Sequence, residues 1–200
     1  MTATSTRHDH PTTTTEARAT RTHQLADAVF ALRRHVDSVS RDDFVAAMRC
    51  VTSGVNVVTT DGEAGRFGLT VSAMTSLSAE PPMLLACINL NSPACAAVRD
   101  NGQFAVNVLK TSQRELADTF AGFPADGKPY DFERATWRNG RRGVPLLEDA
   151  LASFDCAVEA AHEHGSHTLF VGRVVGVSAR DDVPLLYGNR NYLRPIPLHD

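Results

Sequence analysis

Residues 55–62 read Val-Asn-Val-Val-Thr-Thr-Asp-Gly, a run rich in β-branched side chains that ends in a turn dipeptide. β-Branched residues favour extended backbone, and Asp-Gly is typical of the tight turn that joins antiparallel strands. The stretch therefore predicts a strand over Val55–Thr60 that turns at Asp61 and Gly62.

Segments of similar composition recur along the chain. The intervals between them are short and hold few long crossover helices, so we expect the pairing to be mostly antiparallel. The fold class predicted is mainly β with peripheral helices, a barrel rather than a doubly wound sheet. The expected strands are Phe67–Met74, Met83–Asn89, Phe104–Leu109, Phe154–Ala160, Thr168–Ser178 and Pro184–Tyr187.

Helix signals lie between these strands. Ser40 with the acidic pair that follows it predicts a helix over about Arg41–Cys50. Ser92-Pro93 predicts an N-cap followed by proline at the first helical position, and Gly102 ends that helix. Ser112–Glu115 has the pattern of a capping box, and its helix closes near Gly122. Residues 123–142 lack a period and are expected to form a long loop.

The ends and the composition bound what the chain does. Residues 1–22 are Thr-rich and are expected to form a disordered tail, whereas residues 23–200 are expected to form one domain. The net charge of −3 gives no reason to expect nucleic acid or a membrane surface as a partner. No apolar run suits a membrane span or a secretory signal, so we expect a cytoplasmic protein. The four cysteines form no Cys-x-x-Cys pair, which favours reduced thiols.

The most chemically suggestive segment is Gly68–Ser78, which mixes apolar residues with hydroxyls. A flavin needs this mixture, because its ring fits an apolar slot while its polar edge and phosphate need donors. An edge strand with solvated hydroxyls has the same composition, so the segment alone leaves both interpretations open. The chain contains no Gly-x-Gly-x-x-Gly and no phosphate-binding loop of the Walker type.

Two other segments are candidates. In Cys87–Pro93 a strand ends and a helix begins, which suits an anion at the helix start, although Ser92 can cap the helix without any ligand. Residues 162–167 hold three histidines, but their spacing is poor for metal and we predict no metal site. A turn at His164–Ser166 that presents His167 at the mouth of a strand is the better functional interpretation, and an exposed turn histidine is the alternative. No Gly-x-Ser-x-Gly motif is present, so the sequence gives no indication of serine hydrolase chemistry.

Taken in order, the segments resemble the flavin reductase-like family, the short reductases of two-component flavin-dependent monooxygenases. The resemblance covers about residues 41–195. Each matching piece alone is a weak signal of the family, whereas the series of pieces in this order is specific for it. The matching pieces are Phe44-x-x-x-Met48-Arg49, Thr52-x-Gly54-Val55-x-Val57-Val58-Thr59-Thr60, Gly68–Ala73, Ser76–Ser78, Pro81-Pro82, Phe104–Leu109, Gly165-x-His167–Gly172-x-Val174 and Pro184–Tyr187 with Tyr192.

The resemblance implies a homodimeric split β-barrel that reduces FMN or FAD with NADH or NADPH and supplies a partner monooxygenase. His167 would be the catalytic-site histidine on the nicotinamide side, with Tyr192 closing that pocket. The flavin-binding residues implied are Thr70, Val71, Ser72 and Ala73 at the ring edge, Ser76, Leu77 and Ser78 on the ring or phosphate side, and Cys87, Ile88, Asn89 and Ser92 at the ribityl and phosphate portion.

Two positions depart from the family pattern. The family commonly has Gly-Asp-His where this chain has Gly165-Ser166-His167, and it often has glycine at the position of Arg190. Arg190 either clashes with the nicotinamide pocket or binds a dinucleotide phosphate. Besides the reductase, two alternatives stay open: a flavoprotein of the same fold that retains FMN for another substrate or for electron transfer, and a non-catalytic flavin- or haem-binding barrel.

Overall fold

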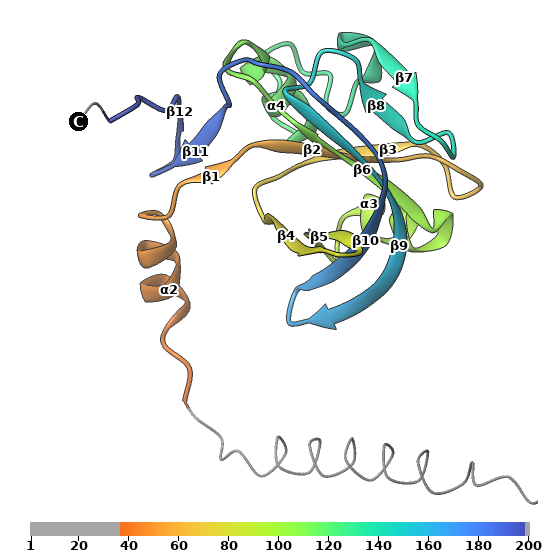
Figure 1. Cartoon of the computed structure of the whole chain (residues 1–200). Coiled ribbons are helices and arrows are strands. Elements are labelled where there is room, and N and C mark those ends of the chain that lie inside the picture. The colour runs from red at the N-terminus through yellow and green to blue at the C-terminus, as the bar shows by residue number, and fades with distance from the viewer. Residues whose placement is uncertain (1–36, 199–200) are drawn as a thin grey trace, which may run out of the picture. The chain divides into compact units, whose positions relative to one another are not determined.

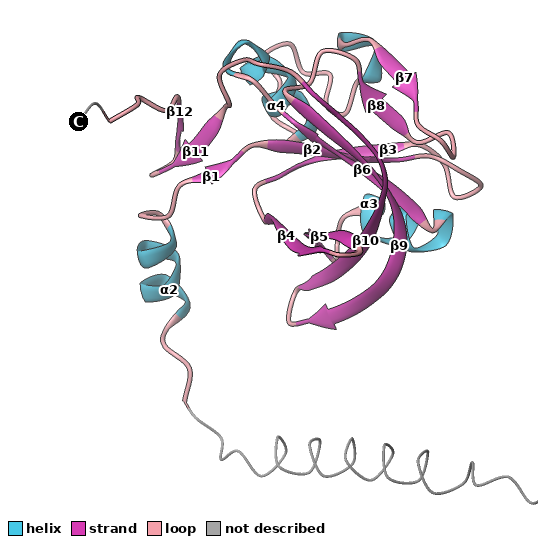
Figure 2. Ribbon diagram, in the orientation of Figure 1, coloured by secondary structure: helices cyan, strands magenta, loops and turns pink. Residues whose placement is uncertain are grey.

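The computed structural model describes residues 37–198. The expected tail over residues 1–22 lies outside these residues. So does the stretch Leu25–Val36, whose sequence predicts one helical face from the spacing of Leu25, Val29, Leu32 and Val36. The chain divides into two compact units after Phe44, and the strands all belong to the unit that begins at Val45. Strands predominate over helices in this unit, and the helices beside them are short (Figure 2).

The helices and strands carry the labels of Figure 1. The helices are α2 (Arg41–Met48), α3 (Pro93–Asn101) and α4 (Arg114–Phe120), with 3₁₀ turns η1 (Thr111–Gln113) and η2 (Phe132–Arg134). The strands are β1 (Ser53–Gly54), β2 (Asn56–Thr60), β3 (Phe67–Val71), β4 (Met74–Ala79), β5 (Pro82–Asn89), β6 (Gln103–Val108), β7 (Trp137–Asn139), β8 (Pro145–Leu147), β9 (Ala152–His164), β10 (His167–Ala179), β11 (Leu186–Gly188) and β12 (Asn191–Leu193).

The main sheet has seven strands in the order β3-β2-β6-β9-β10-β5-β4, and every pairing in it is antiparallel. Its two edges, β3 and β4, are consecutive in the chain but are not hydrogen-bonded neighbours. The barrel is therefore split along this line, as the predicted fold class requires. Register shifts between β9 and β10 at Val171/Gly172 and Val174/Gly176 help to curve the two long strands.

Strand β2 explains why its sequence is so uniformly β-branched. Val57 and Val58 point to opposite faces of the sheet, and both are fully buried. Val58 packs in a core cluster with Ile88, Phe104 and Phe170, whereas Val57 packs in a second cluster with Phe120. Because neither face of β2 contacts solvent, its sequence is not expected to alternate between apolar and polar residues.

The helices agree in part with the sequence prediction. Helix α3 has Ser92 at its N-cap, Pro93 at its start and Gly102 in the left-handed conformation at its end, as predicted. The capping box proposed at Ser112 is wrong, because the reciprocal bonds join Lys110 to Gln113 and α4 starts only at Arg114.

The strand predicted over Phe67–Met74 is interrupted, with β3 ending at Val71 and β4 starting at Met74. The loop predicted over residues 123–142 contains η2 and β7, and β7 pairs with β8. Within residues 37–198, no helix combines the length and apolar character that crossing a membrane requires.

Candidate functional site

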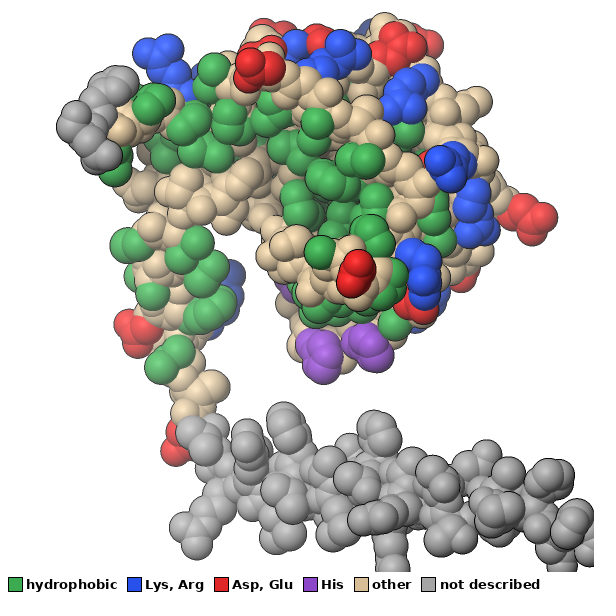
Figure 3. Space-filling view, in the orientation of Figure 1, with side chains coloured by type: hydrophobic (Ala, Val, Ile, Leu, Met, Phe, Trp, Pro, Cys, Tyr) green, Lys and Arg blue, Asp and Glu red, His purple; other side chains and the backbone are tan. Residues whose placement is uncertain are grey.

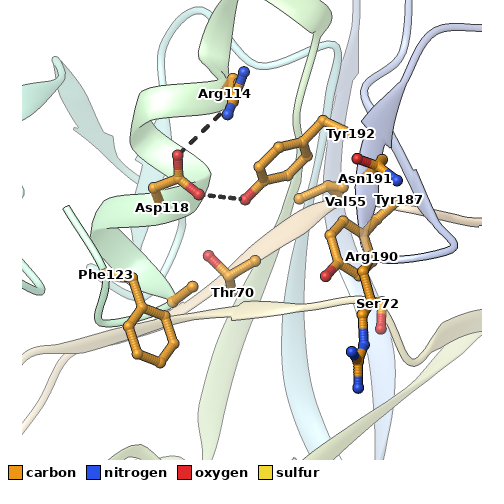
Figure 4. A pocket seen from close by; sticks show the side chains of 11 residues that line it. Val55, Thr70, Ser72, Arg114, Asp118, Phe123, Tyr187, Arg190, Asn191 and Tyr192 are labelled. Atoms are coloured by element: carbon orange, nitrogen blue, oxygen red, sulfur yellow. Dashed lines mark hydrogen bonds and ion pairs between the residues drawn. The ribbon is translucent and has the colours of Figure 1, made fainter. Parts of the chain in front are cut away.

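A pocket of about 480 Å³ lies between the end of β3, helix α4 and the β11–β12 hairpin (Figure 4). We call it the main pocket. Helix α4 contributes Arg114 and Asp118, and the hairpin contributes Tyr187, Arg190 and Tyr192, which reach it from far along the chain. The end of β3 and the residue that follows it contribute Thr70 and Ser72, and Phe123 stands at the rim after α4.

A hydrogen-bonded group closes one side of the main pocket. Tyr192 Oη donates to Asp118 Oδ1 at 2.8 Å, and the Arg114 guanidinium lies 5.3 Å from the centroid of the Tyr192 ring. Arg114 Nε is also 3.9 Å from Asp118 Oδ2. Burial, followed by the hydrogen bond and the charge of Asp118, raises the pKa of Tyr192 above its usual range. Tyr192 is therefore a protonated donor at neutral pH, with its ring held against Tyr187 at a centroid distance of 5.4 Å.

The β3 end supplies hydroxyls. Thr70 Oγ1 donates to the carbonyl of Ala117 at 2.7 Å, which fixes the hydroxyl against α4 and leaves its lone pairs free to accept. Ser72 is exposed in the break between β3 and β4 and lines the main pocket. Ala73 is exposed beside it, and its carbonyl accepts from Cys87 N–H at 3.0 Å. Val71 is 6% exposed, so its side chain belongs to the core.

Other residues implied at the flavin site lie elsewhere. Ser76, Leu77 and Ser78 are on the edge strand β4, and Ser78 Oγ accepts a hydrogen bond from Glu80 N–H. On β5, Cys87 is half-buried and Ile88 is 1% exposed in the core. None of these five side chains lines the main pocket.

The start of α3 forms a second concave region, of about 470 Å³, which we call the α3 pocket. Ser92 lines it together with Arg66, Tyr130 and Phe132, and its side chain makes no capping hydrogen bond. Asn89 lies nearby in the chain but is exposed, and its Oδ1 accepts from Asn91 N–H at 2.8 Å. The structure thus separates Ser92 from the main pocket.

His167 is exposed at the tip of the β9–β10 hairpin, opposite His164 on β9 and Asn89 on β5. Histidine side chains are visible at this lower end of the barrel in Figure 3. The hydroxyl of Ser166 lies 2.9 Å from His167 Nδ1. His167 does not line the main pocket. Among the described residues, no group of three or more His, Cys, Asp or Glu is arranged to hold a metal ion.

The structure therefore gathers Thr70, Ser72, Arg190 and Tyr192 in one pocket. Sequence reasoning missed Arg114 and Asp118. Their i, i+4 spacing on a helix that follows Lys110 is the signal that they share a face, but only the fold brings that face against Tyr192.

Comparison with known proteins agrees with this architecture. The model of the flavin reductase like domain matches residues 48–195. The FMN reductase (NADH) RutF of Stutzerimonas stutzeri is 39% identical over 155 residues, which cover 77% of this chain and 88% of that protein. RutF 1 of Methylorubrum extorquens strain PA1, also an FMN reductase (NADH), is 42% identical over 162 residues, covering 80% of this chain and 78% of the relative.

Solved structures are similar over the same region. The NADH:FAD oxidoreductase SgcE6 of Streptomyces globisporus, in complex with NAD and FAD fragments, superposes with a TM-score of 0.72 and 29% identity. The match covers 82% of this chain and all of that one. The flavin reductase component BorF of a bacterial two-component tryptophan halogenase superposes with a TM-score of 0.69 and 30% identity, over 78% of this chain and 98% of that one. The chain belongs to the flavin reductase-like domain family.

Proposed function

We propose that this protein is an NADH:flavin oxidoreductase that reduces free FMN or FAD in the main pocket. The observation that carries the proposal is the convergence of Thr70 and Ser72 with Tyr192 and Arg190. The first pair comes from the segment expected at the flavin ring, and the second pair comes from the segment expected on the nicotinamide side. A single pocket lined by both pairs suits a reaction in which the flavin ring and the nicotinamide ring must come into contact.

The main pocket fits a flavin ring by its chemistry. Its volume of about 480 Å³ falls within the range of small-molecule sites. Tyr187 and Tyr192 offer aromatic faces for a planar ring, and the Ser72 hydroxyl offers hydrogen bonds at a polar edge. The guanidinium groups of Arg114 and Arg190 suit a ligand that carries phosphate.

When both ligands are bound, the nicotinamide supplies a hydride and the flavin accepts it, so the cofactors carry the chemistry. The protein binds the two ligands and orients them. Thr70, fixed by its bond to the carbonyl of Ala117, gives the pocket a rigid polar edge. Burial, together with the hydrogen bond that Tyr192 donates to Asp118, keeps the phenol protonated, and this bond holds the ring in one orientation. Near-attack stacking of two rings depends on such fixed walls.

His167 is the residue on which the nicotinamide side of the proposal depends. It lies at the hairpin tip, outside the main pocket of a single chain. Ser166 stands at the position where the family commonly has aspartate. Its hydroxyl is within hydrogen-bonding distance of His167 Nδ1, which restrains the imidazole. We place His167 at the outer end of the nicotinamide site, in contact with an amide or a phosphate.

We infer that the reduced flavin leaves for a separate monooxygenase and that the reductase acts as a homodimer in the cytosol. The first inference is supported by the similarity to BorF and to a nitrilotriacetate monooxygenase component B from Mycobacterium thermoresistibile, 28% identical with a TM-score of 0.70. The second is supported by large apolar side chains exposed on the single chain, among them Val177 and Ile196 at 68% and 78%.

The proposal is tested by incubating the purified protein with NADH or NADPH and added FMN or FAD, and following the absorbance of the reduced nicotinamide. We expect oxidation with NADH that depends on added flavin. Absence of oxidation with all four pairs would overturn the proposal. Flavin that co-purifies and survives desalting would instead favour a flavoprotein that retains FMN.

A further inference from the structure

Arg190 occupies a backbone conformation that side-chain-bearing residues rarely adopt. Asn189 and Arg190 form the turn between β11 and β12, with φ angles of 48° and 63°. Two successive positive φ angles define the type I′ hairpin turn, whose second position favours glycine. Among residues 37–198, the Arg190 guanidinium forms no ion pair and no hydrogen bond. The energetic cost of its positive φ angle is therefore not offset by a side-chain interaction with these residues.

The side chain of Arg190 stands between two concave regions. On one side is the main pocket, and on the other is a hollow of about 320 Å³, which we call the outer hollow. Arg190 lines both, together with Ser72 and Tyr187, and Figure 4 shows its side chain extending past Ser72. The shared wall thus carries one cation and two hydroxyl-bearing side chains at the junction.

The outer hollow has a second cation and an apolar lining. Arg49 lines it with Met48 and Val51. The carbonyl of Arg49 accepts a hydrogen bond of 2.9 Å from Asn189 N–H, which ties this segment to the turn that presents Arg190. The backbone segments that carry the two arginines are therefore hydrogen-bonded to each other.

This arrangement matches a ligand of two parts joined by a bridging anion. A dinucleotide has two ring-bearing halves and a pyrophosphate between them. Arginine is suited to that bridge, because its planar fork donates two parallel hydrogen bonds to phosphate oxygens. Ser72 would add a third donor at the same wall.

We propose that Arg190 is a specificity-determining residue that binds the pyrophosphate of a dinucleotide whose halves occupy the main pocket and the outer hollow. The proposal rests on the proposed function, because FAD and NADH both carry this bridge. It predicts that the chain distinguishes a dinucleotide from the corresponding mononucleotide, and that this preference is lost when the guanidinium is removed.

The variant for the test is Arg190→Gly, because glycine is the residue best suited to the turn and the fold should be retained. Arg190→Lys keeps the charge without the fork. Arg194→Gln is the matched control, since it removes an exposed arginine beyond β12 that lines neither concave region. Thermal melting should show R190G to be at least as stable as the unmodified protein.

Dissociation constants are measured for FMN and FAD by quenching of flavin fluorescence, and for NADH and reduced nicotinamide mononucleotide by calorimetry. We expect R190G to weaken the binding of FAD, of NADH or of both by about tenfold, and each mononucleotide by less than about threefold. R190K should recover part of the loss, and R194Q should leave all four constants unchanged. Whichever of FAD and NADH is bound more weakly by R190G is the dinucleotide whose pyrophosphate contacts Arg190.

Three results would overturn the proposal: no change in any constant, an equal loss for a dinucleotide and its mononucleotide, or tighter binding by R190G, which would mean that the guanidinium obstructs the pocket. These results are distinct from failure of the proposed function. That failure would appear as absence of flavin-dependent NADH oxidation by the unmodified protein, whatever the behaviour of R190G.

Discussion

Tyr192 on β12 and Asp118 on α4 lie 74 positions apart and are joined by a 2.8 Å hydrogen bond from the phenol to the carboxylate. The bond attaches the C-terminal hairpin to the helix on the opposite side of the main pocket. It therefore joins two walls of the pocket that, in the proposed function, would receive the stacked rings.

Removing this bond should affect ligand binding more than folding. In Tyr192→Phe the phenol is lost but the ring remains, and the partly exposed Asp118 can return to water. We expect a loss of about 0.5–1.5 kcal/mol in unfolding free energy, together with a several-fold rise in KM for NADH. Denaturant unfolding and steady-state kinetics measure the two effects.

Asp118→Asn is the matched variant, because an amide oxygen still accepts the hydrogen bond. It should keep KM within about twofold of the unmodified protein if the bond itself positions the ring. A rise in KM as large as that of Tyr192→Phe would show that the carboxylate charge matters rather than the orientation of the ring.

The position of His167 leads to a second prediction. His167→Ala should raise the KM for the nicotinamide and leave the dissociation constant of the flavin unchanged, because the imidazole lies outside the main pocket at the hairpin tip. His164→Ala is the control, since His164 is exposed directly opposite on β9. An unchanged KM in His167→Ala would remove this residue from the site.

A third prediction concerns Asn107, which is fully buried and satisfies four groups. Its Oδ1 accepts from Leu147 N–H at 2.8 Å and from the Ser153 hydroxyl at 3.0 Å. Its Nδ2 donates to the carbonyl of Val57 at 3.1 Å and to Thr59 Oγ1 at 3.3 Å. The side chain thus joins β2, β6, β8 and β9.

Asn107→Ala should lower the free energy of unfolding by about 2–4 kcal/mol, because it leaves buried polar groups without partners. Chemical denaturation gives the value. Asn139→Ala, an exposed strand position, should change it by less than about 0.5 kcal/mol. A cost at Asn107 as small as at Asn139 would mean that water replaces the lost bonds.

The strands and α3 were predictable because local signals agree with the fold. Val55–Thr60 is buried on both faces and accordingly has no polar alternation, and the pair Ser92 and Gly102 marks the ends of α3 whatever packs against it. The interruption of the strand after Val71 was not predictable, since Ser72 and Ala73 are compatible with extended backbone. It results from the separation of β3 and β4 to opposite edges of the split barrel.

The pocket was less predictable than the strands. Ser72 and Tyr192 were identified from an ordered resemblance, but Asp118 and Arg114 enter through packing of α4 against a hairpin more than seventy residues away. Ser92 lies in a neighbouring stretch of sequence and still lines a different pocket, because β5 carries it to the α3 end of the barrel. Proximity in the chain therefore does not decide which residues share a site.

Cys156 gives a prediction on pH. Its side chain is fully buried, and this burial, followed by the charge of Asp155, raises the pKa of the thiol to about 12. In the unfolded chain the thiol ionises at its ordinary pKa of about 8.5. The neutral thiol thus contributes stability that is fully present below the unfolded pKa and is lost progressively as the pH rises toward the folded pKa.

The free energy of unfolding should therefore fall faster above about pH 9 in the unmodified protein than in Cys156→Ala, by up to about 1.4 kcal/mol per pH unit. Comparing the two proteins at each pH cancels the other titrating groups. Iodoacetamide gives an independent check at neutral pH, where exposed Cys50 should react while Cys156 stays protected until denaturant is added. Parallel stability curves for the two proteins, or rapid labelling of Cys156 in the native state, would show that the thiol is accessible to solvent.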